Sequence, residues 1–222
     1  MRLLVVSDLH GDLDSAREAI DRFAPDALLS CGDWGDPDRV FEADLTAFAA
    51  RIPLLTTFGN HDPLDLLGRL RDGNGSPALL GRGEVRLFGG LRVAAIGGIR
   101  AKSHRLPHYV TDEDVAAAAA EIAGQGRVDV LLTHGCAIGL ADRTYKGTSG
   151  GHRCFLEANR AIGPRVHVCG HLHRAQERTL KDGRQVLNVG ETPAGSVVVI
   201  EVRGSVPVAR LDRFDRGTAH AQ

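Results

Sequence analysis

Five short motifs along the chain carry residue types that bind metal ions. Each follows an apolar run, and in chain order they are Asp8-x-His10, Gly32-Asp33, Gly59-Asn60-His61-Asp62, His134 and Gly170-His171-x-His173. Their oxygen and nitrogen donors, with no thiolate, suit Mn, Fe, Co, Ni or Zn. The candidate metal ligands are Asp8, His10, Asp33, Asn60, His134, His171 and His173.

These seven ligands exceed what a single metal site usually takes from a protein. If one carboxylate is shared, they fill two sites with four protein ligands each. Two ions roughly 3.5–4 Å apart can bind a phosphoryl group and activate a water for in-line attack. The two-residue spacing within Asp8/His10 and within His171/His173 would put both side chains on the same side of an extended backbone. One segment could therefore supply two ligands.

Alternating strands and helices must position these motifs. In the first part of the chain we predict strands over 3–6, 27–30 and 52–57 and helices over 13–23 and 41–50. Short buried strands that alternate with helices are typical of parallel βαβ units. Because ligands bind at the carboxyl ends of such strands, we expect the motifs to converge at one sheet edge.

The pattern changes after residue 75. Gly89-Gly90 predicts a hairpin between strands 85–88 and 91–96, and two long loops are expected over 97–114 and 135–151. Further helices are predicted near 113–123 and 153–162, with strands over 128–133 and 165–169. Antiparallel strands are expected over 175–180, 184–188, 196–202 and 206–211. We predict a single domain over 1–211 and a flexible tail over 212–222.

Composition excludes several classes of protein. The 222 residues include 27 basic and 28 acidic side chains, and a net charge of -1 argues against binding nucleic acid or anionic membranes by bulk charge. No apolar run approaches the roughly 18–20 residues of a membrane-spanning helix. The first strand begins at Arg2, so no leader is expected before it. Four widely spaced cysteines indicate reduced thiols and a cytoplasmic protein.

The ordered motifs resemble those of the calcineurin-like metallophosphoesterase family, and the resemblance covers residues 3 to about 200. It implies an α/β (α+β) fold, a four-layer αββα sandwich in which two facing mixed β-sheets are flanked by helices. It also implies that Asp8, His10 and His173 hold one metal, that Asn60, His134 and His171 hold the other, and that Asp33 bridges them.

The same resemblance implies catalytic roles for His61 and Asp62. His61 would contact the phosphate and protonate the leaving group, and Asp62 would orient the His61 ring. We expect Asp12 and Asp36 to be helix-capping or solvated acids. Trp34 stands where the family commonly has an aliphatic residue. We expect its indole to cover the sheet edge, with stacking on a substrate base as the alternative.

The two predicted loops leave strand ends on the metal side and carry positive charge. We therefore expect Arg100, Arg143 and His152 to contact an anionic substrate beside Asn60 and His61, with a solvated loop as the alternative. Cys31, Cys136 and Cys169 each lie two residues from a predicted ligand. We expect small buried side chains there, while a redox or soft-metal role stays open.

Together the motifs predict a phosphoester hydrolase that uses two divalent metal ions, with Mn favoured and Fe, Ni, Zn or Co as alternatives. The expected substrate is a small-molecule phosphodiester, such as a cyclic nucleotide, because His61 is present to assist an alkoxide leaving group and residues 142–147 resemble the loop of phosphodiesterase-type members. A phosphomonoesterase of the same family is the alternative. An inactive scaffold on the same fold is the alternative from a different class. Nucleic acid is not an expected partner.

Overall fold

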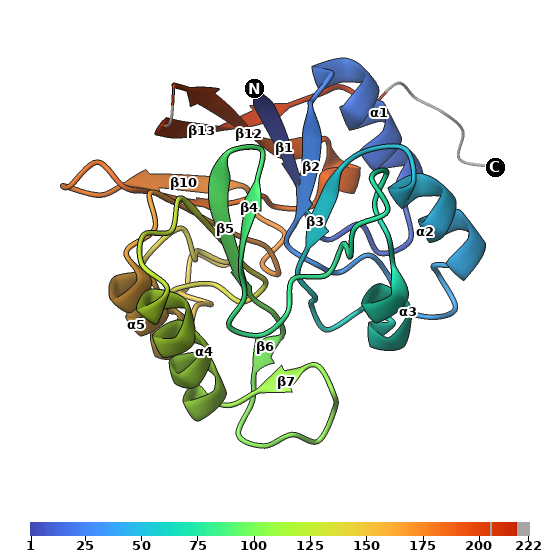
Figure 1. Ribbon diagram of the computed structural model, residues 1–222. Helices are drawn as coiled ribbons and strands as arrows, with labels where there is room; N and C mark the ends of the chain where they lie inside the picture. Colours follow the sequence, from blue (N-terminus) through green and yellow to red (C-terminus); the bar gives the residue numbers. More distant parts are fainter. Residues whose placement is uncertain (205, 217–222) are drawn as a thin grey trace.

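Two β-sheets form the centre of the protein (Figure 1), for which a computed structural model describes residues 1–204 and 206–216. The first sheet has five strands in the order β13 (Val206–Arg213), β12 (Ser196–Arg203), β1 (Arg2–Val6), β2 (Ala27–Ser30) and β3 (Leu54–Thr56). β1, β2 and β3 are parallel, while β12 pairs antiparallel with both β1 and β13. The carboxyl ends of β1, β2 and β3 therefore meet at one edge.

The second sheet has six strands in the order β10 (Gln176–Thr179), β11 (Gln185–Asn188), β9 (Val166–Cys169), β8 (Val130–Thr133), β5 (Leu91–Ile96) and β4 (Val85–Phe88). Its four central strands are parallel, and the outer strands β4 and β10 pair antiparallel with their neighbours. The Gly89-Gly90 turn between β4 and β5 confirms the predicted hairpin. The carboxyl ends of β5, β8 and β9 likewise share one edge.

Helices cover the outer face of each sheet (Figure 1). α1 (Leu13–Phe23), α2 (Glu42–Ala49) and α3 (Leu64–Arg69) pack against the five-stranded sheet, and α4 (Asp112–Gly124) and α5 (Arg153–Ile162) against the six-stranded sheet. Alternation along β1 explains the layering, because Leu3 and Val5 face the other sheet while Leu4 and Val6 face the helices. The predicted four-layer αββα sandwich is confirmed.

Local sequence signals set the helix ends. Asp12 caps α1, as predicted, because its carboxylate accepts the backbone N–H of Ser15 at 3.0 Å. Thr111 and Asp114 form a reciprocal capping box at the start of α4. Within residues 1–204 and 206–216, no helix combines the length and apolar character that crossing a membrane requires.

Four segments differ from the prediction. The segment 97–114, expected to be an irregular loop, contains β6 (Ile99–Arg100) and β7 (Tyr109–Val110), which form a two-stranded parallel sheet. α3 and a 3-10 helix, η1 (Thr192–Ala194), were not predicted. β13 extends beyond residue 211, and Phe214 is buried. The rest of the predicted tail, 217–222, lies outside the described residues.

Candidate metal centre

The motifs converge, as predicted, where strands of the two sheets end. They follow β1, β2 and β3 of the first sheet and β8 and β9 of the second. Backbone hydrogen bonds join the motifs directly. Asp8 N–H donates to Gly32 O at 3.1 Å, and Gly170 N–H donates to His134 O at 3.2 Å. The backbone N–H of His171 donates to Oδ2 of Asp8 at 3.0 Å, so both sheets contribute to one site.

One group of ligand atoms belongs to Asp8, His10 and His173. Nε2 of His173 lies 3.4 Å from Oδ1 of Asp8 and 3.2 Å from Nε2 of His10. Two ring nitrogens at this distance cannot both carry a proton that points at the other. Their atoms and the Asp8 carboxylate lie within 4.8 Å of one another, which suits coordination of a single cation.

A second group surrounds His134, which is fully buried. Its Nε2 lies 3.3 Å from Oδ2 of Asp33 and 3.2 Å from Oδ1 of Asn60. The ring of His171 packs on that of His134 with centroids 5.1 Å apart. Oδ2 of Asp33 also lies 3.9 Å from Nε2 of His10. Asp33 therefore lies between the two groups.

The backbone at these ligands is unusual. Among the described residues, seven non-glycine residues have positive φ, and five of these are predicted ligands: Asp8, His10, Asp33, His171 and His173. Left-handed backbone at non-glycine residues is uncommon and clusters at functional sites. The segments are therefore not extended, so the two-residue spacing argument was wrong in its geometry, although each motif does supply ligands to the site.

Glycines let the ligand segments approach one another. A Cβ on Gly59 would collide with Oδ1 of Asp33 and the ring of His134, and one on Gly170 would collide with the Ser7 and Asp8 side chains. Only glycine fits at these two positions. The glycines of the motifs are therefore required by the packing of the site itself.

Neighbouring groups orient the ligands. Nδ1–H of His134 donates to the carbonyl oxygen of Cys31 at 2.9 Å, which leaves Nε2 facing Asp33. The Ser7 hydroxyl donates to Oδ2 of Asp8 at 2.6 Å, and the backbone N–H of His171 contacts both oxygens of that carboxylate. Nδ1 of His173 lies 3.4 Å from Oε2 of Glu191. These contacts hold the donor atoms in place.

Electrostatics favour a cation here. Burial acts to raise the pKa of Asp33, but the hydrogen bond and charge of His134 outweigh it and lower that pKa. Burial lowers the pKa of His171 to about 4, so its imidazole stays neutral near pH 7 with a nitrogen free to bind metal. An ionised carboxylate between imidazole groups is a donor set that fits divalent metal ions.

His61 contacts Asp36, not Asp62. Nδ1 of His61 lies 3.0 Å from both carboxylate oxygens of Asp36. The buried Asp62 instead accepts backbone N–H groups of Asp33, Trp34 and Gly59 at 2.8, 2.7 and 2.6 Å. The prediction that Asp62 orients the His61 ring is wrong, because Asp62 is engaged with the backbone. The Asp36 side chain is 48% exposed, which agrees with the expected solvated acid, but its contact with the His61 ring was not predicted.

Two of the three loop residues predicted to contact the substrate have partners elsewhere in the chain. Arg100 makes a two-point ion pair with Asp112 at 3.0 and 2.9 Å, and the exposed Arg143 donates to Gly147 O at 3.0 Å. His152 is exposed at the start of α5. The structure thus places Arg100 and Arg143 on partners within the chain, and contact of all three residues with substrate stays a prediction.

Two other loop residues lie nearer the centre. His108 is close enough to Asp33 and His61 for their charges to affect its pKa, which burial lowers overall. The Tyr145 hydroxyl donates to the backbone oxygen of His173 at 2.7 Å. Both belong to loops whose composition had been noted, but no spacing rule distinguished these two from their polar neighbours.

Trp34 is fully buried and lies edge-on to Phe48, and its Nε1–H donates to the Thr56 hydroxyl at 2.9 Å. It covers the sheet, as predicted, and does not form a stacking surface for substrate. Cys31, Cys136 and Cys169 are free and buried, which agrees with the expected packing role.

An αββα sandwich with aspartate, asparagine and histidine ligands at the strand ends is the architecture of a metallophosphoesterase. The model of the calcineurin-like phosphoesterase family matches residues 1–175, and the chain belongs to that family. A comparison with the curated proteins gives no match.

Solved structures share the fold. A novel archaeal phosphodiesterase is 15% identical with a TM-score of 0.54, and the match covers 95% of this chain and 99% of that one. A dimetal phosphatase from Danio rerio is 13% identical with a TM-score of 0.55, over 97% and 99%. GAP50, described as the anchor in the inner membrane complex of Plasmodium, is 10% identical with a TM-score of 0.62, over 96% and 84%.

Proposed function

We propose that this protein is a hydrolase of small-molecule phosphodiesters that uses two divalent metal ions. The observation that carries the proposal is the position of Asp33, whose Oδ2 lies 3.3 Å from Nε2 of His134 and 3.9 Å from Nε2 of His10. One carboxylate thus faces both groups of ligands. A single metal site would need no such shared oxygen.

The residues present fit two ions. Asp8, His10 and His173 would hold one, Asn60, His134 and His171 the other, and Asp33 would bridge them. Mixed carboxylate, amide and imidazole donors favour Mn, with Fe, Ni, Zn and Co as alternatives. When bound, the ions supply positive charge for the phosphoryl oxygens and lower the pKa of a water.

The chain's own groups then bind the phosphate and move a proton. Asn60 lies next to His134 and would contact both a metal and the phosphate. His61 would donate a proton to the leaving group. Asp36 occupies Nδ1 of its ring and fixes the ring orientation, which leaves Nε2 for that transfer. We include Asp62 in the catalytic machinery through the backbone of Asp33, which it holds.

A phosphodiester is favoured over a monoester because its alkoxide leaving group needs a proton donor, and His61 with Asp36 forms one. A monoesterase of the same family is the alternative within the enzyme class. The resemblance of this fold to GAP50, described as an anchor, makes an inactive scaffold the alternative from another class. The intact set of ligands argues for the enzyme.

Hydrolysis of bis(p-nitrophenyl) phosphate and p-nitrophenyl phosphate in the presence of Mn(II), with a chelator control, tests the proposal. We expect chelator-sensitive turnover of both, with the diester preferred. His61→Ala should retain both metals and lose about 10²–10⁴-fold in kcat. Because His61 also lies within 4.8 Å of donor atoms of His10 and Asp33, loss of metal in this variant would make it a ligand instead. Absence of turnover in metal-loaded wild type would favour the scaffold.

A further inference from the structure

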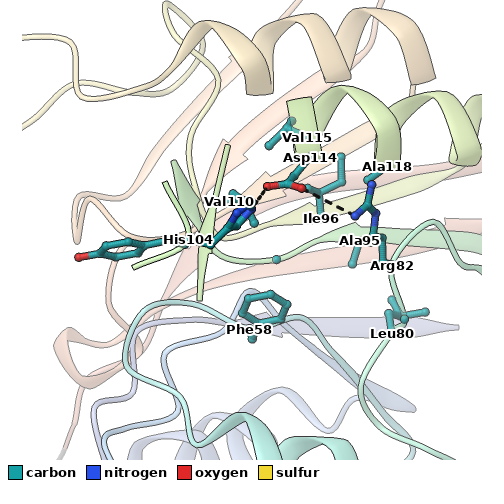
Figure 2. Close-up of a pocket in the computed structure, with 13 residues that line it drawn as sticks. Phe58, Leu80, Arg82, Ala95, Ile96, His104, Val110, Asp114, Val115 and Ala118 are labelled. Carbon is teal, nitrogen blue, oxygen red and sulfur yellow. Dashed lines mark hydrogen bonds and ion pairs between the residues drawn. The ribbon is translucent and has the colours of Figure 1, made fainter. Parts of the chain in front are cut away.

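A cavity lies beside the metal centre and has no part in the mechanism above. Its volume is about 270 Å³. It is bounded by the loops after β3 and β5, the β7 segment and the first turns of α4 (Figure 2). Small-molecule sites typically have volumes of about 300–1,000 Å³, so this cavity suits one ring system rather than a large ligand.

The lining of the cavity is apolar with a polar rim. Leu80, Ile96, Val115 and Ala118 supply aliphatic surface, and Phe58 and Tyr109 supply two aromatic rings. Figure 2 shows the Phe58 ring across the cavity from Asp114. Flat aromatic groups pack well on such surfaces.

The charged side chains at the rim pair with one another. Asp114 lies between His104, in hydrogen-bond contact at 2.5 Å, and Arg82, at 3.8 Å (Figure 2). Because both cations already face this carboxylate, the rim does not form an anion site. It does offer donors and an acceptor for the polar edge of a ring.

Two chain segments connect the cavity to the metal centre. Phe58 immediately precedes Gly59-Asn60-His61, and its backbone oxygen accepts the N–H of Gly98 at 2.7 Å. Tyr109 follows His108, whose backbone oxygen accepts the N–H of Ile99 at 3.2 Å, in the same loop after β5 as Gly98. A substrate with its phosphate at the metals would need to extend only past these residues to reach the cavity.

The sheet topology also places the cavity near the metal centre. β5 runs parallel to β8, so Ile96 at the end of β5 and His134 just after β8 lie at the same edge of the six-stranded sheet. Gly97 then leads directly into the β6–β7 segment over the cavity. The cavity and the metal centre therefore lie at the same edge of this sheet.

We propose that this cavity binds the planar base of a nucleotide substrate whose phosphoester lies at the metal centre, an inference that rests on the proposed function. The aromatic pair, the single-ring-system volume and the polar rim select for a heteroaromatic group. Because the rim groups already pair with one another, the aromatic lining favours a flat ring over an aliphatic chain, and a second phosphate would meet Asp114. The protein would thus act on nucleotide esters in preference to simple alkyl phosphodiesters.

Two p-nitrophenyl esters with the same leaving group test this. The p-nitrophenyl ester of thymidine 5′-monophosphate carries a base, and methyl p-nitrophenyl phosphate does not. With Mn(II), we expect wild type to favour the nucleotide ester in kcat/KM by about tenfold or more, because burial of one aromatic ring contributes at least that much. Ala118→Leu should fill the cavity and abolish the preference while leaving turnover of the methyl ester unchanged.

Tyr109→Leu is a second variant, which removes the ring and keeps the apolar bulk, and it should reduce the preference as well. The matched control is Leu106→Ala, in the same segment but outside the cavity lining, which should retain it. Circular dichroism confirms that each variant folds. Equal kcat/KM for the two esters in wild type, or an undiminished preference in both cavity variants, would overturn the inference.

If neither ester is hydrolysed, the proposed function fails, and binding decides the role of the cavity separately. Isothermal titration calorimetry would compare thymidine 5′-monophosphate with inorganic phosphate on wild type and Ala118→Leu. Nucleotide binding about tenfold or more tighter than phosphate, lost in Ala118→Leu, supports the base site. Equal affinities in wild type exclude it.

Discussion

Replacement of Asp62 by alanine should disturb the metal centre through the backbone. The Asp62 carboxylate accepts three buried N–H groups, from Asp33 at 2.8 Å, Trp34 at 2.7 Å and Gly59 at 2.6 Å. It thereby joins the segment after β2, which carries Asp33, to the segment after β3, which carries Asn60. Alanine removes all three acceptors at once.

The loss of stability in Asp62→Ala depends on the number of N–H donors left without an acceptor. A buried donor without a partner costs about 1–3 kcal/mol, so three of them should lower the free energy of unfolding by at least about 3 kcal/mol. Burial raises the pKa of Asp62 to about 7, whereas the N–H groups act in the opposite direction. The donors lose their acceptors in Asp62→Ala whichever protonation state the carboxyl has.

Urea unfolding of the metal-free protein, followed by circular dichroism, measures this loss. Asp65→Ala is the matched control, because Asp65 is an exposed acid three residues further on, and it should change stability by no more than about 0.5 kcal/mol. Metal content should also fall in Asp62→Ala, since Asp33 is no longer held. If Asp62→Ala kept its stability and its metals and lost only kcat, Asp62 would act on His61 after all, and the reasoning would be refuted.

Three further predictions concern the charge and burial of single residues. Asp36→Asn should lower kcat about tenfold or more with unchanged metal content, because Asp36 contacts Nδ1 of the imidazole that we propose as the proton donor; an unchanged kcat would exclude that role. Asp33→Asn should lose metal and activity, measured by elemental analysis and turnover, while the exposed Asp38→Asn keeps both; full occupancy in Asp33→Asn would refute the bridge. Burial lowers the pKa of His167 to about 4, where it accepts from Asn159 and contacts Thr133. As pH falls, His167 therefore takes up a proton in the unfolded state before it does so in the folded state. About 3 kcal/mol of stability should be lost as pH falls from 6.5 to 4. Urea unfolding across this range should show a weaker pH dependence in His167→Gln than in wild type, and parallel curves would contradict the assignment.

The layers of the fold could be predicted because each follows from local periodicity. The apolar runs at 3–6 and 27–30 and the helical spacing in 13–23 appear as β1, β2 and α1. The facing of two sheets came from the resemblance, since periodicity alone does not say which sheets pack together. The β6–β7 pair escaped prediction because strands of two residues carry no alternation to detect.

The convergence of the ligands was predictable because strand ends of parallel sheets share an edge. Their backbone conformation was not, because positive φ at Asp8 or His171 depends on how the segments pack rather than on residue type. The exchange of roles between Asp36 and Asp62 has the same origin. Both are acids near His61, and only the folded chain decides which carboxylate meets the imidazole and which meets the backbone.

Composition alone did not identify which loop residues contact the metal centre. Arg100 and Arg143 were chosen for their charge, yet Arg100 pairs with Asp112 at the start of α4 and Arg143 with Gly147 in its own loop. The contact to the centre instead comes from Tyr145, whose hydroxyl donates to the backbone oxygen of His173. Charge alone does not say where a loop side chain points, because turns such as the Asp142–Ser149 contact fix the loop first.

The most direct test of the central claim is a titration of metal-free protein with Mn(II), with bound metal and hydrolysis of bis(p-nitrophenyl) phosphate measured on the same samples. A shared Asp33 between two groups of ligands predicts two ions per chain and full activity only when the second is bound. Full activity with one ion per chain would contradict the dinuclear site. Two bound ions without hydrolysis would contradict the enzyme.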